Sequence, residues 1–238
     1  MIKIVLLLCF SAMLFARGYH APDNRSQAKN IVKMINFDYK TTRLNGCGYT
    51  YDPKTCMDKT LVDTSTCSVK EKKQTMQWMQ VVPDTFYGRD MACMNEKVCV
   101  SPYTGESYRG KLCCRQTNAE YRKMEAELFN LIPVVSAISK KHEGKPFGDI
   151  KKPKKLVGKV KIDDNYIEPP DEVKGDIARV YLYMDQRYSL QLTTDEKEMF
   201  LRWHNLDAVD QRECDMAKII MKVQGSSNRL LEEGCKKF

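Results

Sequence analysis

This sequence is rich in cysteines, which can form disulfide bonds or bind metal ions. The chain has 10 cysteines and 3 histidines. No two cysteines between residues 40 and 115 have C-x-x-C spacing, and His20, His142 and His204 lie outside that region. Zinc sites use such spacing, whereas many cysteines in an oxidising compartment form disulfides. The pattern favours disulfides over zinc for Cys47, Cys56, Cys67, Cys93, Cys99, Cys113 and Cys114.

Two further cysteines lie near the C-terminus. Cys214 stands at the start of a predicted helix, residues 211–223, and Cys235 follows that helix. A bridge between them would fold the tail back along the helix and close a loop of about twenty residues, which contributes roughly 3 kcal/mol. We expect this disulfide.

Lysines could bind an anionic partner. Lys and Arg outnumber Asp and Glu by 39 to 31, and residues 151–161 read KKPKKLVGKVK. This run is either a solvated loop or an arm that contacts the phosphates of DNA or RNA. Such contacts would not read sequence. The candidates are Lys123, Lys140, Lys141, Lys151, Lys152, Lys154 and Lys155.

The first sixteen residues are typical of a secretory signal peptide. A positive start, MIK, precedes the apolar run IVLLLCFSAMLF, and Ala16 offers a small residue for cleavage. We expect a secreted or periplasmic protein without a transmembrane segment after cleavage. Cys9 lies in the removed part, so an odd number of cysteines remains and one thiol is free or pairs outside the chain.

Apolar periodicity predicts a helix over residues 119–133, with Asn118 as N-cap and Pro133 at its end. Thr193 and Glu196 have the spacing of a capping box. Other helices are expected over residues 29–38, 133–141, 176–188 with Asp176 as N-cap, and 211–223, the last one, ending near Gly225. Between residues 40 and 115 we expect loops with short strands at 48–51 and 78–82. No repeat or second domain is visible.

Four segments, taken in order, resemble the bacterial endonuclease I family. They are QWMQVVP (77–83), YRKMEAELFNLIP (121–133), EPPDEVKGDIARVYLYMDQRY (168–188) and ECDMAKIIMKVQGSSN (213–228). The family consists of secreted or periplasmic, sequence-nonspecific nucleases. The resemblance implies an α+β fold with a ββα-metal (His-Me finger) core. It suggests an endonuclease I-like domain at 45–238, which an N-terminal segment at 17–44 would join to the signal peptide expected at 1–16.

The resemblance also implies an active site. Family members read W-E-H-V-V-P where this chain has Trp78 to Pro83, so Met79 replaces a glutamate that binds Mg²⁺ and Gln80 replaces the histidine that acts as general base. The asparagine of the family's H-N-L-x-P run, a second metal ligand, corresponds to Asn130. A Gly-Glu-Val-Asn run and a Q-G-N-H-N-P run correspond to 136–139 and 224–229, which places Ser139 and Ser227 at family positions.

These substitutions decide the expected function. Gln80 cannot take a proton from water, and the thioether of Met79 is too soft for Mg²⁺, which prefers oxygen ligands. The sequence therefore predicts an impaired pseudonuclease that binds nucleic acid or a protein partner. Two alternatives stay open. One is an active, Mg²⁺-dependent nuclease with an unorthodox site, in which His142 swings in; the other is a structural or protein-interaction module without a cofactor.

Overall fold

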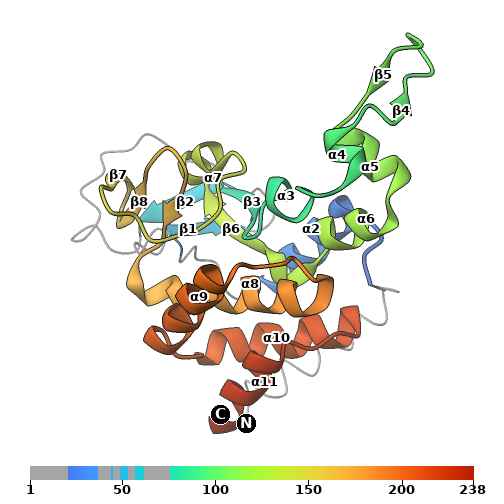
Figure 1. Ribbon diagram of the computed structural model, residues 1–238. Coiled ribbons are helices and arrows are strands. Elements are labelled where there is room, and N and C mark those ends of the chain that lie inside the picture. Colours follow the sequence, from blue (N-terminus) through green and yellow to red (C-terminus); the bar gives the residue numbers. More distant parts are fainter. Residues whose placement is uncertain (1–20, 37–43, 45–48, 53–56, 62–75) are drawn as a thin grey trace.

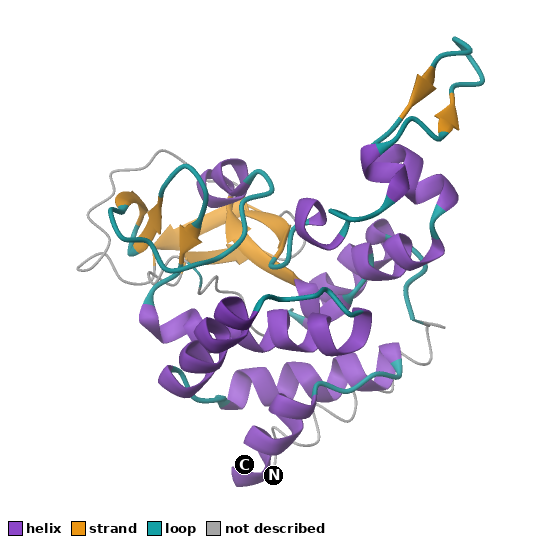
Figure 2. Ribbon diagram, in the orientation of Figure 1, coloured by secondary structure: helices purple, strands orange, loops and turns teal. Residues whose placement is uncertain are grey.

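The C-terminal helices form a layer of their own, apart from the larger strands (Figure 1). The computed structural model describes residues 21–36, 44, 49–52, 57–61 and 76–238. In Figure 2 the larger strands lie in the upper half, above a layer of helices. That layer contains α8 (Lys174–Tyr188), α9 (Thr194–Leu206), α10 (Gln211–Gln224) and α11 (Arg229–Gly234). The expected α+β class is confirmed.

The strands form small antiparallel sheets. The pair that matters most for the site is β3 (Met76–Gln80) with β6 (Leu131–Val135), in which Trp78 lies opposite Pro133. The others are β1 (Tyr49–Asp52) with β2 (Met57–Leu61), β4 (Cys99–Val100) with β5 (Ser107–Tyr108), and the three-stranded β7 (Lys154–Val157), β8 (Val160–Ile162) and β9 (Ile167–Glu168). The strands expected near 48–51 and 78–82 are therefore present, shifted by one or two residues.

Short helices and 3-10 turns lie before, between and after these strands. They are α2 (Arg25–Ile35), α3 (Asp84–Tyr87), α4 (Ala92–Asn95), α5 (Lys111–Thr117), α6 (Ala119–Glu125), α7 (Ser136–His142) and the 3-10 turns η1 (Leu128–Asn130), η2 (Asp171–Val173) and η3 (Cys235–Lys237). The sequence did not predict α3, α4 and α5, because helices of four to seven residues are too short to show periodicity.

Disulfides stabilise that part of the chain. Cys93 bonds to Cys114 and joins α4 to α5, while Cys99 bonds to Cys113 and joins β4 to α5. The disulfide prediction is thus confirmed for these four cysteines. Cys47, Cys56 and Cys67 lie outside the described residues.

The helix predicted over residues 119–133 is correct only in its first half. Asn118 caps it as expected, accepting a hydrogen bond from the Tyr121 amide at 2.9 Å. The helix ends at Glu125, and residues 131–135 form β6 instead. The spacing of apolar residues typical of a helix continues through residues 128–131, which is why the sequence predicted one long helix. In the structure, however, the run LIPVV pairs with β3 as a strand. Pro133 therefore lies within a strand and does not close a helix.

The later helix boundaries also differ in part. The capping box of Thr193 and Glu196 is confirmed at the start of α9. Helix α8 begins at Lys174, so Asp176 lies in its first turn and is not the N-cap. Gly225 ends α10 in a left-handed conformation with φ 71°, as predicted, but α11 follows it, so α10 is not the last helix.

The N-terminal helix starts earlier than predicted. Helix α2 begins at Arg25, because the side chain of Asn24 caps it by accepting a hydrogen bond from the Gln27 amide. Its buried residues, among them Ile31 and Ile35, join the main core. No helix in the described part of the chain is long and apolar enough to cross a membrane.

Helix α8 connects the helical layer with the rest of the core. The ring of Tyr181 stacks on Phe200 of α9 at 4.2 Å between centroids, and Phe86 of α3 packs edge-on against the Tyr181 ring at 5.6 Å. Both rings of the stack are buried. This aromatic cluster holds α3, which borders the candidate site, against the helical layer.

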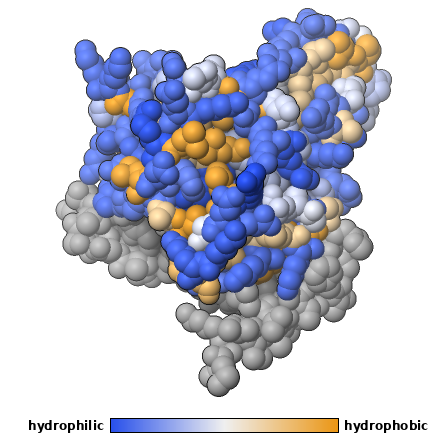
Figure 3. Space-filling view, turned by 60° about the horizontal axis from the view of Figure 1, so that its bottom comes forward, coloured by the Kyte–Doolittle hydropathy of each residue, from blue (hydrophilic) through white to orange (hydrophobic). Residues whose placement is uncertain are grey.

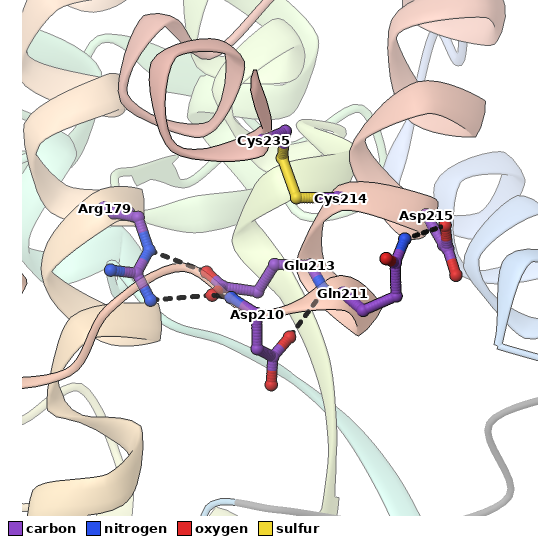
Figure 4. The surroundings of a disulfide bond; sticks show 7 residues. All are labelled: Arg179, Asp210, Gln211, Glu213, Cys214, Asp215 and Cys235. Atoms are coloured by element: carbon purple, nitrogen blue, oxygen red, sulfur yellow. Dashed lines mark hydrogen bonds and ion pairs between the residues drawn. A yellow bond between two sulfur atoms is a disulfide. The ribbon is translucent and has the colours of Figure 1, made fainter. Parts of the chain in front are cut away.

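The C-terminal end is fixed by a disulfide and a buried ion pair, shown in Figure 4. Cys214 and Cys235 are bonded as predicted, with their Cα atoms 5.6 Å apart. Beside them, the buried Arg179 guanidinium donates to both carboxylate oxygens of Glu213 at 2.7 Å. Asp210 caps the same helix by accepting from the Glu213 amide. The ion pair attaches α10 to α8, and the disulfide attaches the C-terminal turn η3 to α10.

Candidate functional site

The strands β3 and β6 and the helix α7 form one continuous unit. β3 ends at Gln80 opposite Leu131, the first residue of β6, and α7 starts directly after β6 at Ser136. Figure 1 shows α7 lying beside this strand pair. The unit brings the end of β3, which carries Met79 and Gln80, close to the last turn of α7.

A cavity of about 160 Å³ opens beside this unit. The strand β3 contributes Trp78, Met79 and Gln80, and α7 contributes Ser139 and His142. The remaining lining comes from the neighbouring loops and from α2, α3 and α5: Arg25, Pro83, Asp84, Lys111, Glu143 and Gly144. The sequence predictions at positions 79, 80 and 139 and the alternative at 142 therefore meet in one place.

Gln80 is held by hydrogen bonds to its surroundings. Its side-chain amide nitrogen donates to the Tyr87 hydroxyl at 3.0 Å and to the Glu125 carbonyl oxygen at 3.4 Å. The residue is 5 % exposed. Burial raises the pKa of Tyr87 far above its usual range, so this phenol stays neutral. Neither residue can accept a proton from water at neutral pH.

Asn130 does not line this cavity. Its side-chain oxygen accepts from the Val82 amide at 2.7 Å, and its side-chain nitrogen donates to the Val82 carbonyl at 3.0 Å. The residue is fully buried. The geometry gives Asn130 a structural part: it closes the turn after β3 by satisfying a buried backbone N–H and C=O. The metal-ligand role inferred for Asn130 has no support from this arrangement.

Four buried polar atoms of residues that line the cavity have no hydrogen-bond partner in the described part of the chain. They are Arg25 Nε, Trp78 Nε1, His142 Nε2 and Asp84 Oδ2, and the last of these is ion-paired with Lys111. Buried polar atoms normally find partners, because leaving one unpaired costs about 1–3 kcal/mol. Unpaired atoms gathered around one cavity therefore indicate a place built to receive a polar ligand.

Two carboxylates, of Asp84 and Glu143, and two cationic side chains, of Arg25 and Lys111, line the cavity. The Lys111 ammonium lies 2.6 Å from Asp84 Oδ2, and Asp84 is 4 % exposed. Arg25 adds a second positive charge. His142, 5 % exposed, is neutral at pH 7 because burial lowers its pKa to about 4, against the opposing effect of Asp84.

These residues do not fit Mg²⁺. A hard cation needs several oxygen ligands. Met79 offers sulfur, Asn130 is bonded to Val82, and Asp84 is paired with Lys111. Among the described residues, no three His, Cys, Asp or Glu side chains lie close enough together to hold a metal ion.

The lysines that could contact phosphates lie in two places, and Lys123 is separate from the others. Lys140 and Lys141 are exposed on α7, and Lys151, Lys152, Lys154 and Lys155 are exposed on and before β7. Figure 1 places α7 and β7 on the same upper side of the molecule. Lys123, on α6, lines a different hollow with Glu127 and Arg187. Ser227 is exposed after α10 and does not line the cavity.

Sequence reasoning missed Arg25, Asp84 and Lys111. Asp84 directly follows the 78–83 run, so its position gave a signal that could have been used. Arg25 and Lys111 come from α2 and α5, far from that run in sequence, and only the packing of these helices brings them to the cavity.

Comparison with known proteins finds relatives that match most of the chain. A periplasmic deoxyribonuclease of Aeromonas hydrophila is 28 % identical over 221 residues, covering 89 % of this chain and 86 % of that protein. An extracellular deoxyribonuclease of the same species is 28 % identical, covering 96 % and 98 %. Endonuclease-1 of Buchnera aphidicola is 27 % identical, covering 97 % and 93 %. The family model described as Endonuclease I matches residues 18–235, and this chain belongs to that family.

Proposed function

We propose that this protein binds nucleic acid on an endonuclease I scaffold and hydrolyses it far more slowly than its relatives do. In this proposal β3, β6 and α7 are the ββα-metal core of the family. The observation that carries it is Gln80, a buried amide already bonded to Tyr87 at the position of the general base. Like its periplasmic and extracellular relatives, the protein is secreted or periplasmic.

The loss of hydrolysis follows from the chemistry of two adjacent residues. A general base contributes typically ~10²–10⁴ in rate. Gln80 offers no group that can act as one. Met79, 4 % exposed beside it, offers no oxygen for a metal that would polarise the phosphate. Because both residues act on the same step, their effects are not expected to add independently.

The capacity to bind nucleic acid follows from the cationic and hydrogen-bond-donating side chains in and around the cavity. Arg25 and Lys111 carry positive charge into the cavity, and the buried Trp78 N–H has no hydrogen-bond partner within the described residues. Lys151 and Lys152 are exposed and make no ion pair within the described residues. In contrast, Lys159 and Lys161 are paired with Glu172 and Glu168. The unpaired lysines are therefore the better candidates for phosphate contacts.

A DNA-binding titration at several salt concentrations tests this proposal. The logarithm of the affinity should fall linearly with the logarithm of salt, at a slope near −0.9 per phosphate contacted. Replacing Lys151, Lys152 and Lys154 together by alanine should weaken binding and flatten the slope. A charge-matched control changes three exposed lysines of the C-terminal segment, Lys218, Lys236 and Lys237. No binding at low salt would refute the proposal, as would equal effects of the two triple variants.

A second candidate function is an active nuclease, and His142 is the observation that favours it. This histidine lines the same cavity as Gln80, is neutral at pH 7, and has an unpaired Nε2. It could accept the proton of a water molecule whose oxygen attacks phosphorus, while the ester oxygen leaves and takes a proton from solvent. Lys111 would stabilise the charge that builds up on the phosphate.

Plasmid nicking separates the two candidates. We expect nicking near background with Mg²⁺ and with chelator. Strong nicking that disappears in His142→Gln but persists in His204→Gln would establish the second candidate instead. The control histidine lies on α9, away from the cavity, where it contacts Arg179.

A further inference from the structure

A narrow arm, residues 96–112, projects from the molecule. Its two strands, β4 and β5, pair antiparallel, with Cys99 opposite Tyr108 and Val100 opposite Ser107. In Figure 1 the arm extends beyond the rest of the fold at the upper right. Nothing in the described part of the fold covers its tip, and Tyr103 there is 96 % exposed.

The arm is rigid for its size. At the tip, the Ser101 hydroxyl accepts from the amides of Tyr103 and Thr104, and the Ser101 carbonyl accepts from the Gly105 amide. Gly105 has φ 71°, which suits a residue without a Cβ. At the base, the disulfide Cys99–Cys113 attaches the first strand of the arm to α5, and Cys93–Cys114 joins α4, which precedes the arm, to the same helix. A side chain held on such a turn loses little conformational entropy on binding.

Exposed apolar side chains concentrate on this arm. Of the eight large hydrophobic residues that are exposed in the described part of the chain, four belong to it: Val98, Val100, Tyr103 and Leu112. Figure 3 shows apolar residues on the lobe at its upper right, the side where the arm lies. Apolar residues gathered on an exposed projection indicate a contact surface.

The base of the arm reaches the candidate cavity. Lys111, the first residue of α5 after the arm's second strand, is the residue that pairs with Asp84 in the cavity lining. Lys97 and Arg109 are exposed further along the arm. In Figure 1 the arm stands to one side of β3 and α3, and the lysine-bearing α7 and β7 stand to the other. A polyanion lying over the cavity would therefore meet the arm.

We propose that the arm places Tyr103 against the bases of a nucleic acid bound over the cavity. This inference rests on the proposed function and adds the element that grips the bases. Apolar wedges that enter a groove between base steps, and aromatic rings on which unpaired bases stack, are common devices of nucleic-acid-binding proteins. A protein partner fits less well, since a stable interface needs about 800 Å² on each side and the tip is a single turn.

Binding measurements on two tyrosine variants test the inference. Tyr103→Ala should weaken binding roughly 5- to 100-fold, as expected for one lost base–aromatic contact. Tyr103→Phe should bind nearly as the parent does, because stacking needs the ring and not the hydroxyl. The salt slope should stay unchanged in both, since no phosphate contact is removed. Phe238→Ala, an exposed aromatic residue at the C-terminus, is the control and should have no effect.

The same titrations with duplex and with single-stranded oligonucleotides identify the form of nucleic acid. A loss for duplex indicates a groove wedge, and a loss for single strands indicates stacking on unpaired bases; either supports the inference. If the parent protein binds and Tyr103→Ala binds equally well to both forms, the inference is wrong while the proposed function stands. If the parent protein does not bind at all, the proposed function fails and the inference fails with it.

Discussion

Protonation of His142 should make the folded state less stable in mild acid. Burial lowers its pKa from an ordinary 6.5 to about 4 in the folded protein. Below about pH 6.5 the unfolded chain therefore binds a proton that the folded protein does not, and stability falls as the pH drops. The loss ends near pH 4, where both states are protonated.

The size of the effect follows from these two pKa values. A difference of one pKa unit corresponds to about 1.4 kcal/mol, so the complete loss between pH 6.5 and 4 is about 3 kcal/mol. Between pH 7 and pH 5, a convenient range, His142 should account for about 2 kcal/mol of lost unfolding free energy.

Urea denaturation of the parent and of His142→Gln at both pH values measures this share. The glutamine keeps a polar side chain in the cavity but cannot titrate, so the stability gap between parent and variant should shift by about 2 kcal/mol in favour of the variant at pH 5. The comparison cancels other groups, including His204, whose pKa is lowered by burial and by Arg179.

A gap that does not change with pH would refute this reasoning. It would show that His142 titrates normally and is therefore not buried in the neutral form. His204→Gln is the matched control, because it removes a titrating histidine but leaves His142 in place.

Three further predictions concern the scaffold and the site. Asn130→Ala should lower the free energy of unfolding by about 3 kcal/mol in urea, because it leaves a buried N–H and C=O of Val82 unpaired; an unchanged stability would contradict the structural role. Cys214→Ser with Cys235→Ser should cost about 3 kcal/mol in the same assay, by the chain-entropy estimate for their 21-residue separation, and a loss below the error of the measurement would argue against it. The double variant Met79→Glu with Gln80→His should restore little Mg²⁺-dependent plasmid nicking. Adding Ser139→Asn should raise the nicking rate by ~10² or more, because Ser139, and not Asn130, shares the cavity with residues 79 and 80. Equal activity of the double and triple variants would show that Ser139 has no part in the site.

Local signals predicted those parts of the fold that depend on a few neighbouring residues. The caps at Asn118 and Thr193 and the left-handed Gly225 follow from side-chain and backbone chemistry within one turn. The 131–135 strand could not be predicted in this way. Its run LIPVV suits a helix or a strand, and the choice is made by β3, which lies some fifty residues earlier in the chain.

Only the part of the candidate site that lies in the 78–83 motif could be predicted from the sequence. Positions 79 and 80 came from the 78–83 run, and both line the cavity. The cations came from elsewhere: α5 reaches the cavity because two disulfides fix it beside the arm, and no spacing in the sequence reveals that contact.

Asn130 shows why a matching residue does not by itself define a role. Asn130 stands where the N-L-x-P motif has a metal-binding asparagine. Both polar atoms of its side chain, however, form hydrogen bonds with the Val82 backbone. That contact shapes the turn after β3, so Asn130 supports the fold whether or not the protein cuts DNA. Met79 and Gln80, in contrast, line the cavity, and neither side chain can act as a general base or supply a carboxylate to a metal ion. A residue that supports the fold beside two residues without this chemistry is the pattern that the proposed function, binding with little hydrolysis, would require.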